Sequence, residues 1–291
     1  MSTITLVLTP EDASRLYQTF IDDASPAPQY AEWQLRVENC VITRYRSGKT
    51  VFQGKDAEIY ASPFQKQPAP VSEKAADNTV LPQAGSDEVG TGDYFGPVCV
   101  CACIVDEKSA PLVSSLGVTD SKAMTDEAIR KIAPQLLEKL PHSLLIVSPE
   151  KYNQVHDSMN LNAMKAVLHN QAYVHLQEKY GLPKTRVIDQ FAPPASYWRY
   201  LSGQKHIVRP MHFETKAESR WPAVAAASVI ARYAFLCAMD DMEKRFGMHF
   251  AKGAGAAADA SGKEFLERYG EARLKEAAKL HFRNTAKIKG R

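Results

Sequence analysis

The sequence predicts a large α/β domain, built on a mixed sheet flanked by helices, that follows a small N-terminal α+β domain. Residues 62–82 are rich in Pro, Ala, Lys and Gln and show no hydrophobic periodicity, which is typical of a linker. Beyond this stretch, strand and helix patterns alternate, as they do in layered sheets with a parallel portion. Before it lie one helix pattern and a hairpin pattern. We therefore expect domains at residues 1–61 and 83–291.

The N-terminal domain is expected to begin with a strand near Thr3–Leu8, where polar and apolar residues alternate. Thr9-Pro10-Glu11 then starts a helix that reaches about Ile21, with Thr as the cap and Pro in the first turn. Two or three strands follow, and Ser47-Gly48-Lys49 is a turn that joins two of them into a hairpin.

Three basic residues of this hairpin are candidates for contact with nucleic acid. Arg44 and Arg46 have the same strand parity and would point from one face of the sheet, with Lys49 at the turn. An ordinary solvated face explains the same pattern, because antiparallel sheets commonly expose one side to water. The residues alone leave both interpretations open.

The second domain is expected to alternate strands and helices around one sheet. Strands are expected up to Asp87 and at Val98–Val105, Ser143–Val147, Thr185–Asp189 and near His206–His212. Helices are expected at Asp126–Leu140, Leu161–Tyr180, Pro222–Phe246, Gly262–Tyr269 and Glu271–Leu280. Apolar periodicity and end signals, such as Gly181 after the long second helix, set these bounds.

Composition excludes several classes of protein. Hydrophobic residues make up 45% and charged residues 24% of the chain, as in globular rather than disordered proteins. No run approaches the roughly 18 uncharged apolar residues that span a bilayer, so no membrane partner is expected. The first residues are expected to form a strand rather than a secretion signal, and the five cysteines lie in apolar stretches, so we expect reduced thiols. A monomer in the cytoplasm is the expectation.

Charge is distributed unevenly along the chain. Residues 1–70 hold seven Lys and Arg against eight Asp and Glu, whereas residues 241–291 hold twelve against seven. A basic C-terminal end is suited to binding a polyanionic partner. The same charges are also explained by a solvated tail that ends a helix, and charge alone favours neither interpretation.

The acids are the most informative residues. Asp87 and Glu88 follow an apolar lead-in and precede Gly90-Thr91-Gly92, and adjacent acids in a buried strand need a cation to balance them. Asp189 ends a strand, and ligand sites of α/β sheets gather at the carboxyl ends of parallel strands. Glu218 precedes a helix rich in small residues. Considered one at a time, these acids also fit purely structural roles: Asp87 and Glu88 in a surface turn, Asp189 as a cap of the following loop, and Glu218 at the start of a helix.

Four segments match one family when they are taken together. They are GSDEVGTGDYFGPV, Asp120-Ser121-Lys122, Val187-Ile188-Asp189 and TKAESRWPAVAAASVIARY. Over about residues 83–285 the chain resembles ribonuclease HIII, the bacterial sister of ribonuclease HII. ITRYRSGKTVFQG resembles that family's N-terminal domain, which is similar to the TATA-box-binding protein. The resemblance implies an RNase H-like sheet and hydrolysis of the RNA strand of RNA/DNA hybrids.

The resemblance also implies a metal site. Its four carboxylates carry over to Asp87, Glu88, Asp189 and Glu218, as catalytic and metal-binding residues. Such hard oxygen ligands suit Mg²⁺ or Mn²⁺, and a two-metal site activates water and stabilises the leaving oxygen. Because neighbours on a strand face opposite sides, we expect the strand to end or bend at Gly90, so that Glu88 reaches the metals from the rim.

Substrate contacts are expected around this site. Gly90, Thr91 and Gly92 stand where ribonuclease HII has the Gly-Arg-Gly motif that grips a ribonucleotide, and Thr91 replaces the Arg. Ser121 and Lys122 are candidates to hold a phosphate, with a helix cap as the alternative. Lys252, in a Gly-rich loop, is another candidate for phosphate contact. The alternative is that this loop is only a flexible connector.

Two other functions compete with a hybrid-specific nuclease. One is a non-catalytic nucleic-acid-binding protein that uses the first domain and the basic tail. Four acids argue against it, because binding a polyanion gains nothing from carboxylates. The other is a different RNase H-like enzyme, such as a DNA nuclease or an integrase, which only the resemblance disfavours.

Overall fold

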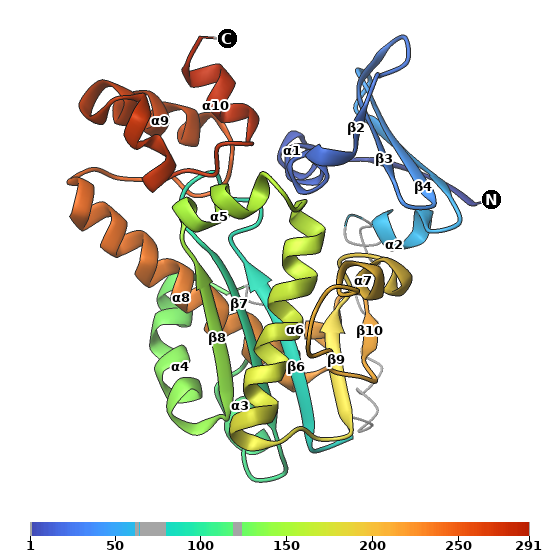
Figure 1. Ribbon diagram of the computed structural model, residues 1–291, viewed down its shortest axis with the longest axis vertical. Coiled ribbons are helices and arrows are strands. Elements are labelled where there is room, and N and C mark those ends of the chain that lie inside the picture. Colours follow the sequence, from blue (N-terminus) through green and yellow to red (C-terminus); the bar gives the residue numbers. More distant parts are fainter. Residues whose placement is uncertain (1, 62–63, 65–79, 119–123, 291) are drawn as a thin grey trace.

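A computed structural model describes residues 2–61, 64, 80–118 and 124–290 of the chain. Within these ranges the chain forms two five-stranded sheets, which lie in different parts of the molecule (Figure 1). Most of the expected linker, residues 62–63 and 65–79, is outside the described residues. The mixed α/β architecture agrees with the fold class that the sequence predicts.

The N-terminal sheet is antiparallel and has the strand order β1-β5-β4-β3-β2. Its strands are β1 (Ser2–Val7), β2 (Ala24–Ser25), β3 (Ala31–Val37), β4 (Cys40–Tyr45) and β5 (Lys49–Gly54). Helices α1 (Pro10–Thr19) and α2 (Ala57–Ala61) cover one face and share its core with Leu35, Ile42 and Phe52. Helix α1 begins as expected, because the Thr9 side chain accepts a hydrogen bond from the Asp12 amide.

Arg44 does not lie on an open face of this sheet, contrary to the prediction. It pairs with Trp33 across the strands and therefore points to the helix-covered side, where it is only 6% exposed. Its guanidinium donates to the carbonyls of Leu8 and Gly48 and to Thr50 Oγ1. Arg44 is thus an internal brace, whereas Arg46 lies just past the end of β4 and is exposed.

The second sheet has the order β10-β9-β6-β7-β8 and is mixed. Its strands are β6 (Gln83–Val89), β7 (Val98–Val105), β8 (His142–Val147), β9 (Thr185–Asp189) and β10 (His212–Glu214). Strands β6, β9 and β10 run parallel to one another, while β7 is antiparallel to both of its neighbours. The carboxyl ends of β6 and β9 therefore meet at one edge.

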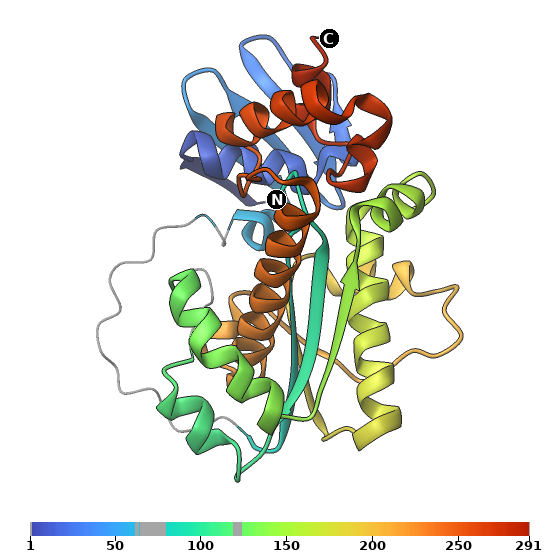
Figure 2. The same cartoon turned by 90° about the vertical axis from the view of Figure 1, so that its left-hand side faces the viewer.

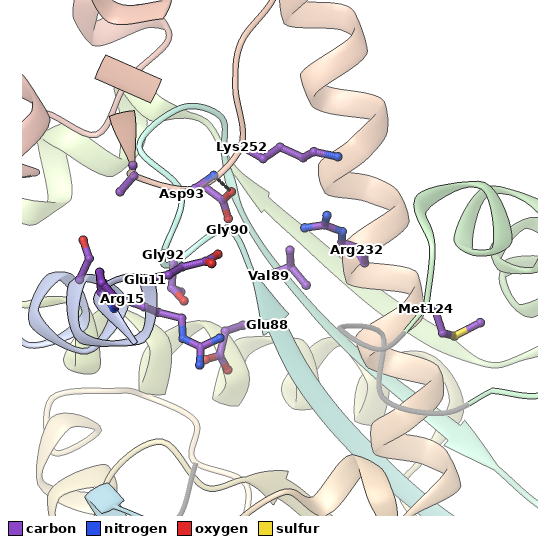
Figure 3. A pocket seen from close by; sticks show the side chains of 16 residues that line it. Glu11, Arg15, Glu88, Val89, Gly90, Gly92, Asp93, Met124, Arg232 and Lys252 are labelled. Atoms are coloured by element: carbon purple, nitrogen blue, oxygen red, sulfur yellow. Dashed lines mark hydrogen bonds between the residues drawn. The ribbon is translucent and has the colours of Figure 1, made fainter. Parts of the chain in front are cut away.

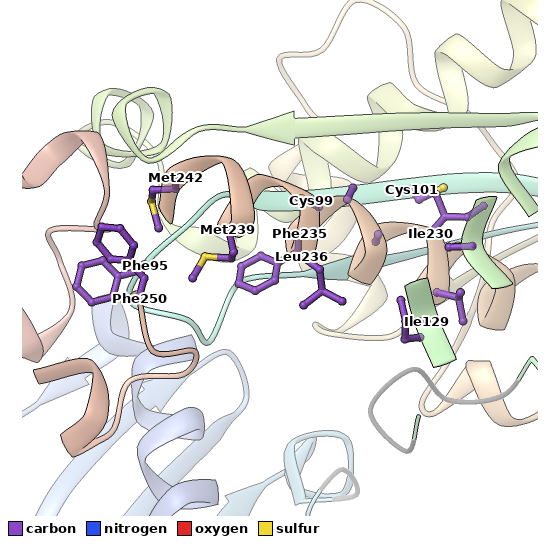
Figure 4. Close-up of a cluster of buried hydrophobic side chains, with 14 of the residues drawn as sticks. Phe95, Cys99, Cys101, Ile129, Ile230, Phe235, Leu236, Met239, Met242 and Phe250 are labelled. Carbon is purple, nitrogen blue, oxygen red and sulfur yellow. The ribbon is translucent and has the colours of Figure 1, made fainter. Parts of the chain in front are cut away.

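Helices cover both faces of this sheet (Figures 1 and 2). On one face, α8 (Pro222–Phe246) packs with α3 (Ala110–Ser115) and α4 (Asp126–Lys139). On the other lie α5 (Pro149–His156), α6 (Leu161–Tyr180) and α7 (Pro194–Tyr200). The core beneath α8 contains Cys99 and Cys101 of β7 beside Ile230 and Phe235 (Figure 4). These thiols are fully buried, as expected for core residues.

Helix α8 lies very close to β6. A Cβ atom at Gly85 would overlap the backbone of Ala223 and Val224, so glycine is needed for this approach. By length and composition α8 could cross a membrane, but 72% of its most apolar window is buried inside the protein. It is therefore accounted for as the core helix of the domain, and its first turn packs against the first residues of β6, where the Ala223 amide donates to Gln83 Oε1.

The C-terminal region departs from the expected elements. Helix α9 spans Ala256–Tyr269, residues Glu271–Glu276 form a 3₁₀ helix, and α10 spans Arg283–Ile288. The strand expected near His206–His212 begins only at His212.

The basic side chains of the tail are largely engaged within the protein. Lys279 is fully buried, and Lys289 pairs with Glu271 at 2.7 Å. Most of its charge therefore serves the fold.

Several side-chain contacts join the N-terminal domain to the second domain. The Arg199 guanidinium of α7 donates two hydrogen bonds to the Glu38 carboxylate, at 2.9 and 3.0 Å. The Arg283 guanidinium of α10 lies 3.6 Å from the centre of the Tyr17 ring on α1. His156 of α5 lies 3.5 Å from Asp22. Together they hold α1 near the carboxyl end of β6.

Candidate active site

Two of the four predicted acids lie side by side at the ends of parallel strands. Strand β6 pairs with β9 so that Ser86 is opposite Ile188, which makes Asp87 and Asp189 the next neighbours in register. Alternate residues of a strand share a face, so Asp87 points to the same side as Gly85, toward the first turn of α8. Asp87 is only 4% exposed.

Glu218 reaches the same side from η4 (Ala217–Ser219), the 3₁₀ turn that leads into α8. The Ala217 amide donates a hydrogen bond of 3.0 Å to Asp189 Oδ1, which ties this turn to the end of β9. Lys216, just before the turn, has the left-handed φ of 56°, and Glu218 is 8% exposed. The η4 turn thus lies on the same side of the sheet as Asp87 and Asp189.

Glu88 takes a different position from the other three acids. Strand β6 turns at Gly90, where φ is +96°, but it stays regular through Val89, so Glu88 points to the opposite face. There it lies 2.6 Å from Lys165 Nζ and 2.8 Å from His169 Nε2, both of α6. His169 Nδ1 is in turn 2.7 Å from Ser86 Oγ. The chain turns at Gly90 as expected, but the turn does not bring Glu88 to the other three acids; Glu88 instead lines the cleft described below.

The partners of Glu88 decide its protonation. Burial alone would raise the pKa of Glu88, but the Lys165 ammonium and the His169 hydrogen bond outweigh burial and hold that pKa well below its ordinary value. Glu88 is therefore an anion at neutral pH. The sequence reasoning missed Lys165 and His169, although their spacing of four residues places them on one face of the predicted helix.

Replacing Lys165 by Met is expected to destabilise the protein by about 3 kcal/mol at pH 7, because a buried carboxylate loses its counter-charge. A carboxyl whose folded pKa is lowered stabilises the fold above its unfolded pKa and loses that effect as pH falls. The difference between wild type and Lys165→Met should therefore shrink between pH 7 and pH 4. Urea unfolding at both pH values measures it, with Lys151→Met, an exposed site, as the control. An equal difference at both pH values would contradict this account.

The donor set fits a hard divalent cation. Carboxylate oxygens are the ligands that Mg²⁺ and Mn²⁺ prefer, and acids buried close together favour a cation between them. Within the described ranges, no three His, Cys, Asp or Glu side chains already surround one point at ligand distance. Asp87, Asp189 and Glu218, which share one side of the sheet, are the residues best placed to hold an ion.

A buried lysine, Lys279, holds the turn that follows β6. Lys279 Nζ donates to the carbonyls of Asp93 and Gly96, both at 2.7 Å, and to that of Phe95 at 3.4 Å. Glycine is required at Gly90, because a Cβ there would overlap the Pro97 carbonyl. Burial lowers the pKa of Lys279 to about 8. One side chain from the C-terminal region therefore organises the whole loop.

The lowered pKa of Lys279 predicts that the stability of the fold changes with pH. Between about pH 8 and 10.5 the folded side chain is deprotonated while the unfolded one keeps its proton, so the fold gains stability as pH rises. Relative to Lys279→Met, wild type should gain up to about 3 kcal/mol across this range. Urea unfolding at pH 7.5 and 10 tests this, with the exposed Lys275→Met as control. A flat difference would show that the folded and unfolded proteins bind the Lys279 proton equally, so that burial does not lower the pKa of this side chain.

A cleft of about 710 Å³ lies over this turn (Figure 3). Glu88 and the loop from Val89 to Asp93 line one side of it, together with Lys252 of the Gly-rich loop. Lys252 forms an ion pair with Asp126, and the Gly253 amide donates to Asp93 Oδ1 at 2.6 Å. The structure thus brings Gly90, Thr91, Gly92 and Lys252 to one cleft. Ser121 and Lys122 lie outside the described residues.

Comparisons with known proteins show the family to which the chain belongs. Residues 84–285 match the family described as ribonuclease HII, and residues 3–77 match a domain of unknown function. Ribonuclease HIII from Bacillus licheniformis is 41% identical over 99% of this chain and 98% of its own length. The chain belongs to the ribonuclease HII family, in its ribonuclease HIII branch. Ribonuclease HIII from Bacillus velezensis is 43% identical over 94% of this chain and 93% of its own.

Structural similarity gives the same answer for the fold. The crystal structure of Bst-RNase HIII in complex with Mn²⁺ has a TM-score of 0.71 and 38% identity, over 99% of this chain and 98% of that chain. The RNase H-like fold and the ribonuclease HIII resemblance are therefore confirmed. As a member of this family the chain is an endoribonuclease of the ribonuclease H type.

Proposed function

We propose that this chain cuts the RNA strand of RNA/DNA hybrids by a two-metal-ion mechanism and leaves 5′-phosphate and 3′-hydroxyl ends. The observation that carries the proposal is that Asp87, Asp189 and the turn with Glu218 lie on one side of the sheet, while the next residue after Asp87, Glu88, lines a cleft. When bound, Mg²⁺ or Mn²⁺ would polarise the attacked phosphodiester and the attacking water.

The residues of the chain have separate tasks in this proposal. Asp87, Asp189 and Glu218 supply oxygen ligands, while Lys165 and His169 keep Glu88 ionised and fixed in direction. The turn at Gly90, Thr91 and Gly92 lines the cleft where the strand would pass. Backbone amides of such a turn are suited to contact the 2′-hydroxyl, the group that distinguishes RNA from DNA.

Cleavage assays on three duplexes of one sequence test the proposed activity. End-labelled RNA/DNA hybrid, double-stranded RNA and double-stranded DNA are incubated with Mg²⁺, with Mn²⁺ or with EDTA. We expect cleavage of the RNA strand of the hybrid alone, loss of cleavage in EDTA, and products whose 5′ ends are phosphatase-sensitive. Equal cleavage of double-stranded DNA would indicate a different RNase H-like nuclease, and cleavage in EDTA would exclude the metal site.

We also propose that the N-terminal domain holds the hybrid through the turn between β4 and β5. Arg46 and Lys49 are exposed there, whereas the buried Arg44 takes no part. Replacing both by Ala should weaken binding of a long hybrid and lower the slope of log K against log salt by about two, one for each lost phosphate contact. The control is the double replacement of Lys108 and Lys131, two exposed lysines near α3 and on α4. Unchanged binding would show that this turn does not contact the substrate.

A further inference from the structure

Helix α1 of the N-terminal domain forms one wall of the cleft over the Gly90–Asp93 turn. Pro10, Glu11, Ser14 and Arg15 line this wall, opposite the Gly90–Asp93 loop. The stem of Arg15 lies over the turn, since a Cβ atom at Gly92 would be 3.5 Å from Arg15 Cγ. Figure 3 shows the Arg15 side chain extending from α1 into the cleft toward Glu88. A cation of the first domain thus reaches the cleft that the second domain forms at the end of β6.

The position of α1 does not depend on Arg15 itself. The stacking of Arg283 on Tyr17 holds the same helix, and the Arg199–Glu38 pair holds the sheet behind it. Removing the Arg15 side chain should therefore leave the two domains in place. Any functional effect of such a change can then be assigned to the guanidinium.

Arg15 is poised to exchange its present partner for a ligand. It pairs with Asp12 at 2.8 Å, but the two side chains are 48% and 36% exposed, so the pair contributes at most about 1 kcal/mol. The other cations of the cleft are more firmly engaged: Arg232 and Lys252 both bind the Asp126 carboxylate. A phosphate that enters the cleft would therefore find its most available guanidinium at Arg15.

We propose that Arg15 binds a backbone phosphate of the strand being cut, where that strand passes the Gly90–Gly92 turn. This inference rests on the proposed function. A guanidinium offers a rigid fork of donors that matches two phosphate oxygens. Glu11, an acid on the same wall, disfavours a phosphate nearer the start of the helix. Phosphate contacts fix the position of a strand without reading its sugar, so Arg15 would set the register of the strand over the carboxylates.

The test compares Arg15→Gln and Arg15→Lys with a matched control. Arg268→Gln is that control, because Arg268 is 49% exposed and pairs with Glu264 one turn away on α9. Hybrid affinity is measured against salt concentration in an Asp87→Asn background, and kcat and KM are measured in the active enzyme. We expect Arg15→Gln to weaken binding about tenfold, lower the salt slope by about one and lower kcat/KM about tenfold or more.

Two further results are expected if the contact is direct. Arg15→Lys should keep the wild-type salt slope, because the positive charge is retained. It should keep only part of the wild-type kcat/KM, because Lys lacks the forked donors of the guanidinium. The urea midpoint of Arg15→Gln should equal that of Arg268→Gln. Equal affinity, slope and kcat/KM in Arg15→Gln and Arg268→Gln would overturn the inference. A wild type that leaves hybrids uncut would instead overturn the proposed function, so the two failures are distinguishable.

Discussion

Asp87→Asn is expected to lower kcat on an RNA/DNA hybrid by about a thousandfold or more, equivalent to roughly 4 kcal/mol in the barrier. The amide has the size of the carboxylate, so the packing of β6 against α8 is retained. It lacks the negative charge that a hard divalent ion requires. Hybrid binding should be preserved or strengthened, because one source of repulsion toward the phosphates is removed.

Single-turnover cleavage in Mg²⁺ and hybrid affinity without added metal measure the two effects separately. Asp241→Asn is the matched control, because Asp241 is on α8 and its side chain is 77% exposed. It should cleave like wild type. Full activity of Asp87→Asn in Mg²⁺ would remove Asp87 from the metal site.

The second large effect concerns the choice of substrate. The resemblance to ribonuclease HII places Thr91 at the position of an Arg, and a Thr side chain can neither reach as far nor supply a forked cation. Recognition of RNA would then depend on the turn and on contacts spread over several ribonucleotides. We expect efficient cleavage within runs of about four or more ribonucleotides, and kcat/KM at least about a hundredfold lower at a single ribonucleotide in duplex DNA.

Both substrates should be compared at equal enzyme concentration and ionic strength, because phosphate contacts make affinity strongly dependent on salt. A phosphate contact at Arg15 would strengthen binding of both substrates alike and would leave the preference unchanged. Comparable kcat/KM on the two substrates would instead assign the chain the behaviour expected of ribonuclease HII.

Much of the architecture follows from local patterns that tertiary packing does not override. Helix α6 has the predicted bounds, Leu161–Tyr180, and Gly181 ends it as the sequence predicts. The strand at Thr185–Asp189 is likewise observed with the predicted bounds. Because parallel strands end at one edge, the meeting of Asp87 and Asp189 could also be foreseen.

Other features depend on information that no single segment carries. Parity places Arg44 on one face of β4 but does not say which face the helices cover, and the helices cover the face of Arg44. Charge counting gives a basic tail but does not show that Lys279 is buried beneath the loop at Asp93–Gly96. In both cases a cation serves the fold because backbone carbonyls surround it.

The partners of Glu88 show the same limit. Helix α6 has apolar residues on most sides, so Lys165 and His169 carry no clear amphipathic signal. Only the packing of α6 against β6 brings them to a carboxylate that the strand alternation turns away from Asp87. Arg15 belongs to the same class, because it meets Gly92 only through the docking of two domains.

The most direct test of the metal site is to locate Mn²⁺ by anomalous diffraction in crystals of the full chain, soaked with and without a bound hybrid carrying a non-cleavable linkage. The expected result is an anomalous peak within ligand distance of Asp87 and at least one of Asp189 and Glu218, which disappears in Asp87→Asn. Mn²⁺ bound only at positions remote from these three carboxylates, in crystals of a preparation that cleaves hybrids, would contradict the account.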